Sequence, residues 1–343
     1  MMASVPVTVR QAPGLWAAVA DVSRRAGVRP PDEIHLIGDP DVTVEEDSVL
    51  LGLVGGRRRM SVGLALLHTL GADELLALVA YESARRGARN EERAAQVAIR
   101  AAGPETVARA TRELWAVREA WESFLNVYVQ PGREAGYAPE DVFGGFAAMV
   151  DARRPLLGLG EPVRRATALM GDIPLSWGHR LLDPGERMLL GWPDFTTAVM
   201  TAELQREADR IYRRIGSVIA GDPGRLSLAH VFDLIAGGPL PLGLIAGALF
   251  PDRTRDEAVP LFAGPLATLM RLAAVRSCVA EWRHTWAGPP ELVGPDGLPL
   301  RLEDLAARAL GSPEAAAEAC RRLTDLGVVL FAGAGPGRHR SIE

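Results

Sequence analysis

Apolar residues first recur at helical spacing between residues 12 and 26, where Leu15, Trp16, Val19 and Val22 fall on one face. The pattern then changes to short runs rich in β-branched residues and separated by turn-forming residues, which is typical of strands. It predicts a helix over 12–26, followed by strands at Glu33–Gly38, Val42–Glu45, Ser48–Val54 and, after a turn at Gly55-Gly56, Arg57–Val62.

Helical periodicity dominates from residue 63 to residue 152. Gly71 interrupts the first apolar run, and Gly103-Pro104 and Pro131-Gly132 bound the longest one, because glycine and proline disfavour helix interiors. Within that longest run, four aromatic residues fall at helical spacings and are expected in the core: Trp115, Trp121, Phe124 and Tyr128. The predicted helices cover residues 63–70, 72–88, 91–102, 105–130 and 139–152.

The second half of the chain is predicted to be mostly helical. Residues 153–195 are rich in Pro, Gly and Arg and predict loops with short helical pieces. Further helices are expected at 197–220, through the Ala/Leu-rich region 226–288, and at 303–310 and 313–326. Ser312 and Pro313 provide the cap and the first turn of the last helix. A β-hairpin is predicted within Pro289–Leu302, around Gly294–Gly297.

These elements predict an α+β protein that is mostly helical, with a small N-terminal β-sheet and a helical C-terminal region. No internal repeat is visible in the sequence. The expected divisions are a first domain at 1–190, a helical region at 191–288, a hairpin-plus-helices unit at 289–330 and a disordered tail at 331–343.

Composition is that of a water-soluble globular protein, with 343 residues of which 48% are hydrophobic and 24% charged. The formal net charge of −5 disfavours nucleic acid as a partner. The chain contains no lysine, which excludes lysine chemistry. The longest uncharged stretch, between Asp233 and Asp252, is interrupted by prolines and glycines, so no membrane span is expected. Two distant cysteines and a first segment unlike a signal peptide predict a cytoplasmic protein.

The most informative segment is the predicted helix that contains Ala72–Arg86. Many zinc proteases hold their metal on a helix of the form D-E-L-x-x-x-x-x-H-E-x-x-H, where the two histidines lie one turn apart and the glutamate activates the bound water. Here Tyr81 and Arg85 occupy the histidine positions, and only Glu82 remains. A phenol is protonated near neutral pH, and a guanidinium has no lone pair to offer a dication. The six histidines supply no other pair at helical spacing, so the expected metal is none.

The order of strands and helices around this segment resembles the HtpX-like and CAAX prenyl endopeptidase group of zinc metallopeptidases. The resemblance covers roughly residues 10–190 and implies a zincin-like core for the first domain. Its motifs are strand and helix segments in the same order as in the family: Asp32–Leu36, Glu46-Asp47, Gly56–Met60, Gly63-Leu64, Gly71–Arg85, Trp121 with Phe124 and Tyr128, Pro131-Gly132 and Pro139–Phe146.

In this family the third zinc ligand is the glutamate of an E-x-x-A-D motif on a later helix. The matching segment here begins at Glu91, and Ala95 replaces the aspartate of the motif. Only a few residues separate Arg85 from Glu91, whereas family members place a longer, often membrane-inserting segment there. A late H-P-x-x-x-x-R element is matched loosely by His179 and Arg187. The resemblance thus implies Tyr81, Arg85, Glu91, His179 and Arg187 as binding residues, with Glu82 as the residual catalytic residue.

Three functions fit these observations. The first is a catalytically inactive metallopeptidase homologue, a pseudopeptidase of bacterial type, which binds a protein, a peptide or a small anionic molecule in the former active-site cleft. The second is a metal-independent enzyme that uses Tyr81, Glu82, Arg85 and Glu91 for acid–base chemistry. The third is an active zinc peptidase whose ligands are not evident. In a purely structural alternative, Arg85 neutralises Glu82 and Glu91 in an inert site.

Overall fold

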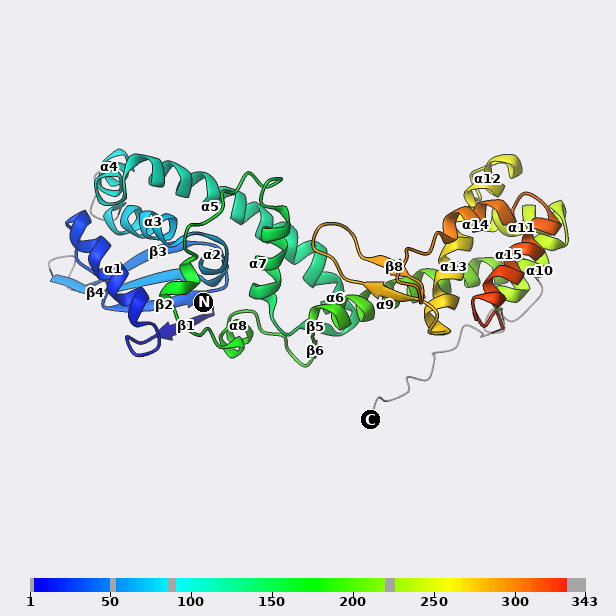
Figure 1. The fold of residues 1–343 in the computed structure, drawn as a ribbon, viewed down its shortest axis with the longest axis horizontal. Coiled ribbons are helices and arrows are strands. Elements are labelled where there is room, and N and C mark those ends of the chain that lie inside the picture. Colours follow the sequence, from blue (N-terminus) through cyan, green and yellow to red (C-terminus); the bar gives the residue numbers. More distant parts are fainter. Residues whose placement is uncertain (1–2, 50–53, 86–90, 220–225, 332–343) are drawn as a thin grey trace. The chain divides into compact units, whose positions relative to one another are not determined.

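The computed structural model describes residues 3–49, 54–85, 91–219 and 226–331. These residues form two compact units, one made by Met1–Phe195 with Trp286–Gly288 and the other by Thr196–Thr285 with Pro289–Glu343. Figure 1 shows helices throughout both units and a four-stranded sheet near the N-terminus. The mostly helical α+β class predicted from the hydrophobic pattern is confirmed.

The sheet of the first unit has the strand order β1-β2-β4-β3. Strand β4 lies parallel to β2 and antiparallel to β3, so β3 forms one edge. The short strand β1 was not predicted. The turn predicted at Gly55-Gly56 is wrong, because both residues lie inside β4, and the break predicted within β3 is a bulge between Glu46 and Ser48. The bounds are Ser4–Val7 for β1, Glu33–Ile37 for β2, Val42–Val49 for β3 and Val54–Gly63 for β4.

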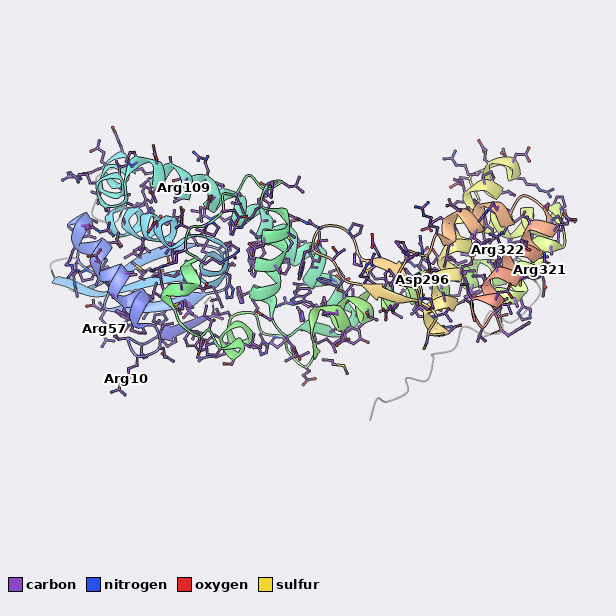
Figure 2. All side chains as sticks on the ribbon, in the orientation of Figure 1. Arg10, Arg57, Arg109, Asp296, Arg321 and Arg322 are labelled. Atoms are coloured by element: carbon purple, nitrogen blue, oxygen red, sulfur yellow. The ribbon has the colours of Figure 1, made fainter. Side chains whose placement is uncertain are left out.

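One face of the sheet is apolar and buried, and the other is polar. Val5, Leu36, Val44, Met60 and Val62 all face the core. On the opposite face Glu33 pairs with Arg57 and Arg59, and Figure 2 labels Arg57 at the surface. This alternation is what a sheet with one solvated face requires.

Helix α3 is the central helix of the first unit. It packs against α1, α4, α5 and strand β3 (Figure 1). Leu75, Val79 and Ala80 on this helix are buried completely. The break predicted at Gly71 is confirmed, since it separates α2 from α3. The helices of this layer are α1 (Pro13–Ala26), α2 (Leu64–Thr69), α3 (Ala72–Arg85), α4 (Glu91–Ala102) and α5 (Pro104–Phe124).

The helical run of α5 continues further than predicted. A π-helical turn, η1 (Leu125–Val129), leads into α6 (Gln130–Ala135), where Pro131 lies in the first turn and its missing N–H is not needed. The run ends at Gly136, whose φ of 90° favours glycine. The remaining elements are β5 (Tyr137–Pro139), α7 (Val142–Arg153), η2 (Ala166–Leu169), α8 (Leu175–Leu181) and β6 (Met188–Leu190), with β5 and β6 paired in parallel.

The aromatic residues of this helical run have two different environments. Trp121 and Phe124 are buried and contact Phe143 and Phe146. Trp115 is 66% exposed, so the prediction that it belongs to the core is wrong. Trp115 lies about 120° from Trp121 around the helix and about 180° from the buried Phe124, so it faces away from the buried side of α5.

The second unit is built from helices around one hydrophobic core. Helix α9 (Trp192–Gly216) enters this unit at Thr196. Helix α14 packs on α13, and α15 packs on α10, so the residues after 289 share a core with the preceding helices. The other elements are α10 (Leu228–Ala236), α11 (Pro239–Leu249), α12 (Arg255–Leu261), α13 (Ala263–Arg276), β7 (Glu281–Arg283), β8 (Glu291–Val293), α14 (Leu302–Ala309) and α15 (Pro313–Asp325).

The hairpin predicted within Pro289–Leu302 is partly present. Its turn exists, because Gly297 N donates to Gly294 O at 2.9 Å and Leu300 N donates to Leu292 O at 2.9 Å. The regular partner of β8 is nevertheless β7, which precedes the predicted hairpin. The Ser312 cap of α15 is confirmed, since Ala315 N donates to its Oγ at 3.2 Å.

One helical stretch, Arg255–Arg276, is long and apolar enough to cross a membrane by length and composition alone. Its mean hydropathy is 1.6, and 44% of the apolar window is buried. Leu266, Ala267 and Met270 of this stretch lie in the core of the second unit, and Arg271 pairs with Glu303. Core helices of water-soluble proteins pass the same test, so the stretch carries little weight for membrane crossing.

Candidate functional site

The last turn of α3 is held in place by a buried arginine of the sheet. Arg58 on β4 is only 6% exposed, and its guanidinium donates to Ser83 O at 2.5 Å and to Arg29 O at 2.6 Å. Carbonyl groups in the last turn of a helix lack partners within the helix, so this contact satisfies one of them. Arg58 therefore fixes the helical turn that carries Tyr81, Glu82 and Arg85.

Glu82 and Arg85 form an ion pair within this turn. Arg85 Nε donates to Glu82 Oε2 at 2.8 Å, and the two side chains are 49% and 18% exposed respectively. Burial raises the pKa of the Glu82 carboxyl above its usual range, although Arg85 opposes this shift. The hydrogen bond to Glu82 raises the pKa of Arg85, so the guanidinium stays charged.

Tyr81 and Glu91 lie in the same electrostatic environment. Burial, followed by the charges of Glu91 and Glu82, raises the pKa of the Tyr81 phenol. The charge of Glu91 also contributes to the raised pKa of Arg85. Tyr81, Glu82 and Arg85 lie in the last turns of α3, and Glu91 is the first residue of α4, which packs against α3. The charge of Glu91 therefore acts on the residues that the sequence aligned with the zinc-binding positions.

Two further charged residues extend this group. Arg118 on α5 donates to Asp41 Oδ1 at 2.8 Å, and both charges act on Glu82. Asp41 follows β2 in a loop that passes close to Gly63, where a Cβ atom would lie 2.3 Å from Asp39 O, so glycine is required there. We call the following residues the ion cluster: Asp41, Tyr81, Glu82, Arg85, Glu91 and Arg118.

An exposed aromatic residue borders the ion cluster. The guanidinium carbon of Arg118 lies 5.6 Å from the ring centroid of Trp115, which is a cation–π distance. Trp and Arg are the residue types most enriched among the energetically dominant residues of protein interfaces. The arrangement combines fixed charges of both signs with an aromatic side chain at the surface.

The ion cluster does not fit a zinc ion. At the two histidine positions of the motif it has the protonated phenol of Tyr81 and the guanidinium of Arg85. The Glu82 carboxylate is already paired with this guanidinium. A dication beside Arg85 would be repelled. Among the residues that the structure describes, no group of three or more His, Cys, Asp or Glu side chains is arranged to hold a metal ion.

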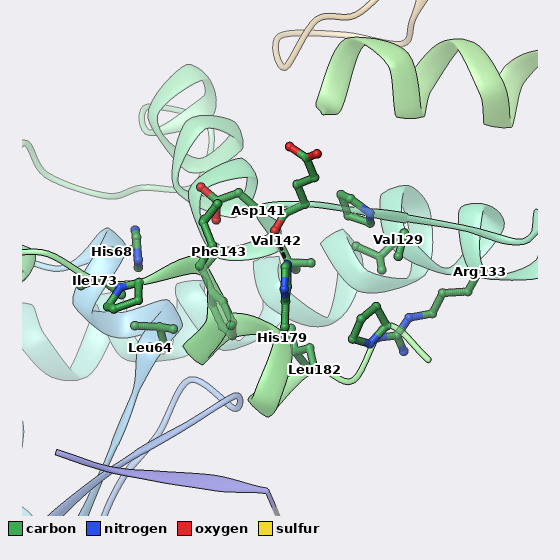
Figure 3. Close-up of a pocket in the computed structure, with 17 residues that line it drawn as sticks. Leu64, His68, Val129, Arg133, Asp141, Val142, Phe143, Ile173, His179 and Leu182 are labelled. Carbon is green, nitrogen blue, oxygen red and sulfur yellow. Dashed lines mark hydrogen bonds between the residues drawn. The ribbon is translucent and has the colours of Figure 1, made fainter. Parts of the chain in front are cut away.

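His179 and Arg187 are not part of the ion cluster. His179 lies on α8, and its Nε2 is 2.7 Å from Glu140 O (Figure 3). Arg187 donates from Nε to Arg133 O at 3.1 Å and from its terminal nitrogen to Pro184 O at 2.9 Å, so it fastens β6 and its loop to α6. These two residues of the loosely matched late element therefore have local structural contacts.

A small cavity of about 50 Å³ lies beside His179 in the first unit. Figure 3 shows His68, Phe143 and Arg133 around it. Burial lowers the pKa of His68, whose ring stacks on Phe143 at a centroid distance of 6.4 Å. Neither this cavity nor a larger one in the second unit, between the α10–α11 turn and α12, is lined by Tyr81, Glu82, Arg85 or Glu91. The ion cluster is therefore not part of either cavity.

Sequence reasoning missed four residues that shape the site: Arg58, Asp41, Trp115 and Arg118. Arg58 lies in the predicted strand Arg57–Val62, and the alternation that turns Met60 and Val62 towards the core also turns Arg58 inward. Arg118 lies three residues after Trp115, a spacing that puts the two on one helix face. No local signal connects Asp41 with α5.

Compared with protein-family models, with curated proteins and with solved structures, the chain matches none.

Proposed function

We propose that this protein is a zinc-free metallopeptidase homologue, a pseudopeptidase, which binds an extended segment of another protein at the ion cluster. The observation that carries the proposal is the ion pair between Arg85 and Glu82, close to Tyr81 and Glu91. A guanidinium here supplies the positive charge that a metal would supply at the corresponding positions of the motif.

An extended protein segment is the partner that best matches the surroundings of the cluster. Strand β3 is an edge strand and packs beside α3, so its outer backbone groups are available for pairing with an added strand. Trp115 offers an aromatic contact, and Arg85 and Arg118 offer cations for acidic side chains or a terminal carboxylate. The Arg85 side chain is half exposed, which suits a protein segment lying on the surface better than a small molecule enclosed by the protein.

The homology part of the proposal is tested by restoring the metal ligands. We expect the double variant Tyr81→His/Arg85→His to bind about one equivalent of zinc through the two imidazoles and Glu91, as in three-ligand catalytic sites. Elemental analysis of the purified variant measures the zinc. Adding Glu91→Ala to the double variant is the matched control and should abolish the binding. A double variant that folds and takes up no zinc would contradict the homology.

The binding part is tested with a library of random peptides displayed on phage and selected on the full chain. We expect acidic peptides to be enriched, and their affinity to fall at least tenfold in Trp115→Ala and in Arg85→Ala. Leu156→Ala is the control, because Leu156 is a similarly exposed apolar residue outside the cluster. Equal losses in all three variants, or no enrichment at all, would contradict binding at this site.

The acid–base enzyme remains a second candidate because burial raises the pKa of Glu82, as catalytic acids require. It predicts turnover of ester or peptide substrates that Glu82→Gln abolishes while the fold, monitored by circular dichroism, is retained. Peptide binding that survives Glu82→Gln, with no turnover by the parent protein, favours the pseudopeptidase.

A further inference from the structure

The second unit contains an open cavity of about 440 Å³, which falls in the size range of ligand sites. It lies between the α10–α11 turn, helix α12 and the α14–α15 turn. Most of its wall is apolar and is formed by Ile235, Pro239, Leu242, Val259, Leu310 and Pro313. A cavity of this kind can take up apolar side chains of a ligand.

Two charges of opposite sign lie on the same wall. The side chains of Arg255 and Asp256 line the cavity, and neither forms a hydrogen bond or an ion pair with any residue that the structure describes. Both side chains are exposed, so they remain available to a ligand. The cavity thus offers one cation and one anion beside an apolar surface.

Helix α11 is shaped to let Arg255 approach. A Cβ atom at Gly243 would lie 2.4 Å from Arg255 Nε and 2.9 Å from its Cδ, so any larger residue would displace the guanidinium. A glycine inside a helix costs about 1 kcal/mol relative to alanine. The close approach of Arg255 explains why a glycine is found inside α11.

We propose that this cavity binds a short apolar peptide with free termini. The apolar wall takes the side chains, Arg255 binds the terminal carboxylate, and Asp256 binds the terminal ammonium. A fatty acid would pair its carboxylate with Arg255, but the same carboxylate would then lie near Asp256 and be repelled by it. A fully apolar ligand would desolvate both charges without pairing either. The site shares no residue with the ion cluster and does not depend on the function proposed for it.

The test uses the tripeptide Leu-Leu-Leu and the full chain, with binding measured by isothermal titration calorimetry near pH 7. We expect saturable binding at millimolar or lower concentration. The C-terminal amide and the N-acetyl form should each bind about tenfold more weakly, because each loses one charge-assisted interaction. Decanoate should bind more weakly than the free tripeptide.

Three variants test which terminus of the peptide each of the two charged residues binds. Arg255→Ala should lower the affinity for the free tripeptide about tenfold and make the free acid and the C-terminal amide bind equally well. Gly243→Ala should have the same two effects, because it displaces Arg255. Asp256→Asn should remove the difference between the free and acetylated amine. Arg253→Ala is the matched control, since Arg253 is exposed two residues away and does not line the cavity.

Each variant is first shown to retain the parent's helical circular dichroism. If Leu-Leu-Leu does not bind the parent chain, the proposal is wrong. The same holds if the acid and the amide bind equally well, or if Arg255→Ala binds the free tripeptide as tightly as Arg253→Ala does. Binding that responds to Arg85→Ala in place of Arg255→Ala would locate the peptide at the ion cluster and overturn this site.

Discussion

Helix α3 carries two arginine-paired glutamates, Glu74 in its first turn and Glu82 in its last, and their surroundings differ. Figure 2 labels Arg109 on α5, which is the partner of Glu74. The Glu74 side chain is 7% exposed, and Arg109 Nε lies 2.6 Å from its Oε1. Glu82 is 18% exposed, and its partner Arg85 comes from its own helix and is half exposed.

The difference separates a structural pair from one that is available for binding. The Glu74 pair joins two helices, and the Glu74 carboxylate has almost no access to water, so the protein depends on Arg109 to neutralise it. The Glu82 pair joins no separate elements, and Arg85 can turn towards a partner at little cost in stability. We therefore expect stability to depend on the Glu74 end of α3 and binding on the Glu82 end.

The largest expected effect is that of Arg109→Ala. It leaves Glu74 charged and buried without its partner, which should lower the free energy of unfolding by about 3 kcal/mol. Urea unfolding followed by circular dichroism measures the change. Arg112→Ala is the control, because Arg112 is an exposed arginine on the same helix, and it should cost less than about 0.5 kcal/mol. Equal effects of the two variants would refute the structural role of the Glu74 pair.

The next effect is that of Arg58→Ala, which removes the donor to Ser83 O and Arg29 O. We expect a loss of about 2 kcal/mol, because buried carbonyl groups are left unsatisfied. Hydrogen exchange should also show faster opening of the last turn of α3. Arg57→Ala, at the neighbouring exposed position, should have little effect on either measurement. Unchanged exchange in Arg58→Ala would mean that Arg58 does not hold this turn.

A smaller, pH-dependent effect is expected from Glu113→Gln on α5. Burial raises the pKa of the Glu113 carboxyl, so its contribution to stability is present below about pH 4.5 and is lost as the pH rises through the raised pKa. Glutamine can still accept from Gly160 N and has no charge to desolvate. The variant should therefore gain stability relative to the parent as the pH rises from 4 to 7, measured by urea unfolding at several pH values.

The matched control for this prediction is Glu119→Gln, an exposed position on the same helix. Its stability difference from the parent should stay nearly constant with pH. A Glu113→Gln variant that loses stability as the pH rises would show that the Gly160 N–H and the charges of Arg109 and Arg154 together outweigh burial at this carboxyl.

The smallest effect on stability is expected at the binding end. Arg85→Ala removes a pair within one helix turn whose cation is half exposed, and such pairs contribute about 0.3–0.5 kcal/mol. Thermal unfolding should shift by only a few degrees or less. A loss as large as that of Arg109→Ala would remove the distinction between the two ends and favour the inert structural alternative for the cluster.

Much of the local structure was predictable from the sequence. Helix α1, the break at Gly71, the start of α4 at Glu91 and the Ser312 cap all follow from periodicity and capping signals. The wrong predictions concern residues that are compatible with two local conformations. Gly55-Gly56 can form a turn or lie in a strand, and Pro131 can end a helix or occupy its first turn, because each residue is compatible with both conformations.

The candidate site was predictable only in part. That Tyr81 and Arg85 stand at the two positions which histidines occupy in the H-E-x-x-H pattern is a property of the sequence. So is the one-turn spacing that puts these two side chains on one face of α3. The contribution of Glu91 was expected from the resemblance alone. His179 and Arg187 were expected to join the same site, but they make local contacts elsewhere in the first unit, since the late element was matched loosely in register.

The sequence by itself determined which elements form and which chemistry α3 can carry, because periodicity, caps and residue identity act over one or two turns. Only the tertiary structure decided which charges become buried and which stay exposed. Arg58 is enclosed because β4 lies against the end of α3, and Arg118 reaches Asp41 because α5 passes the loop after β2. Such encounters join residues far apart in the chain, and no local pattern encodes the distance between them.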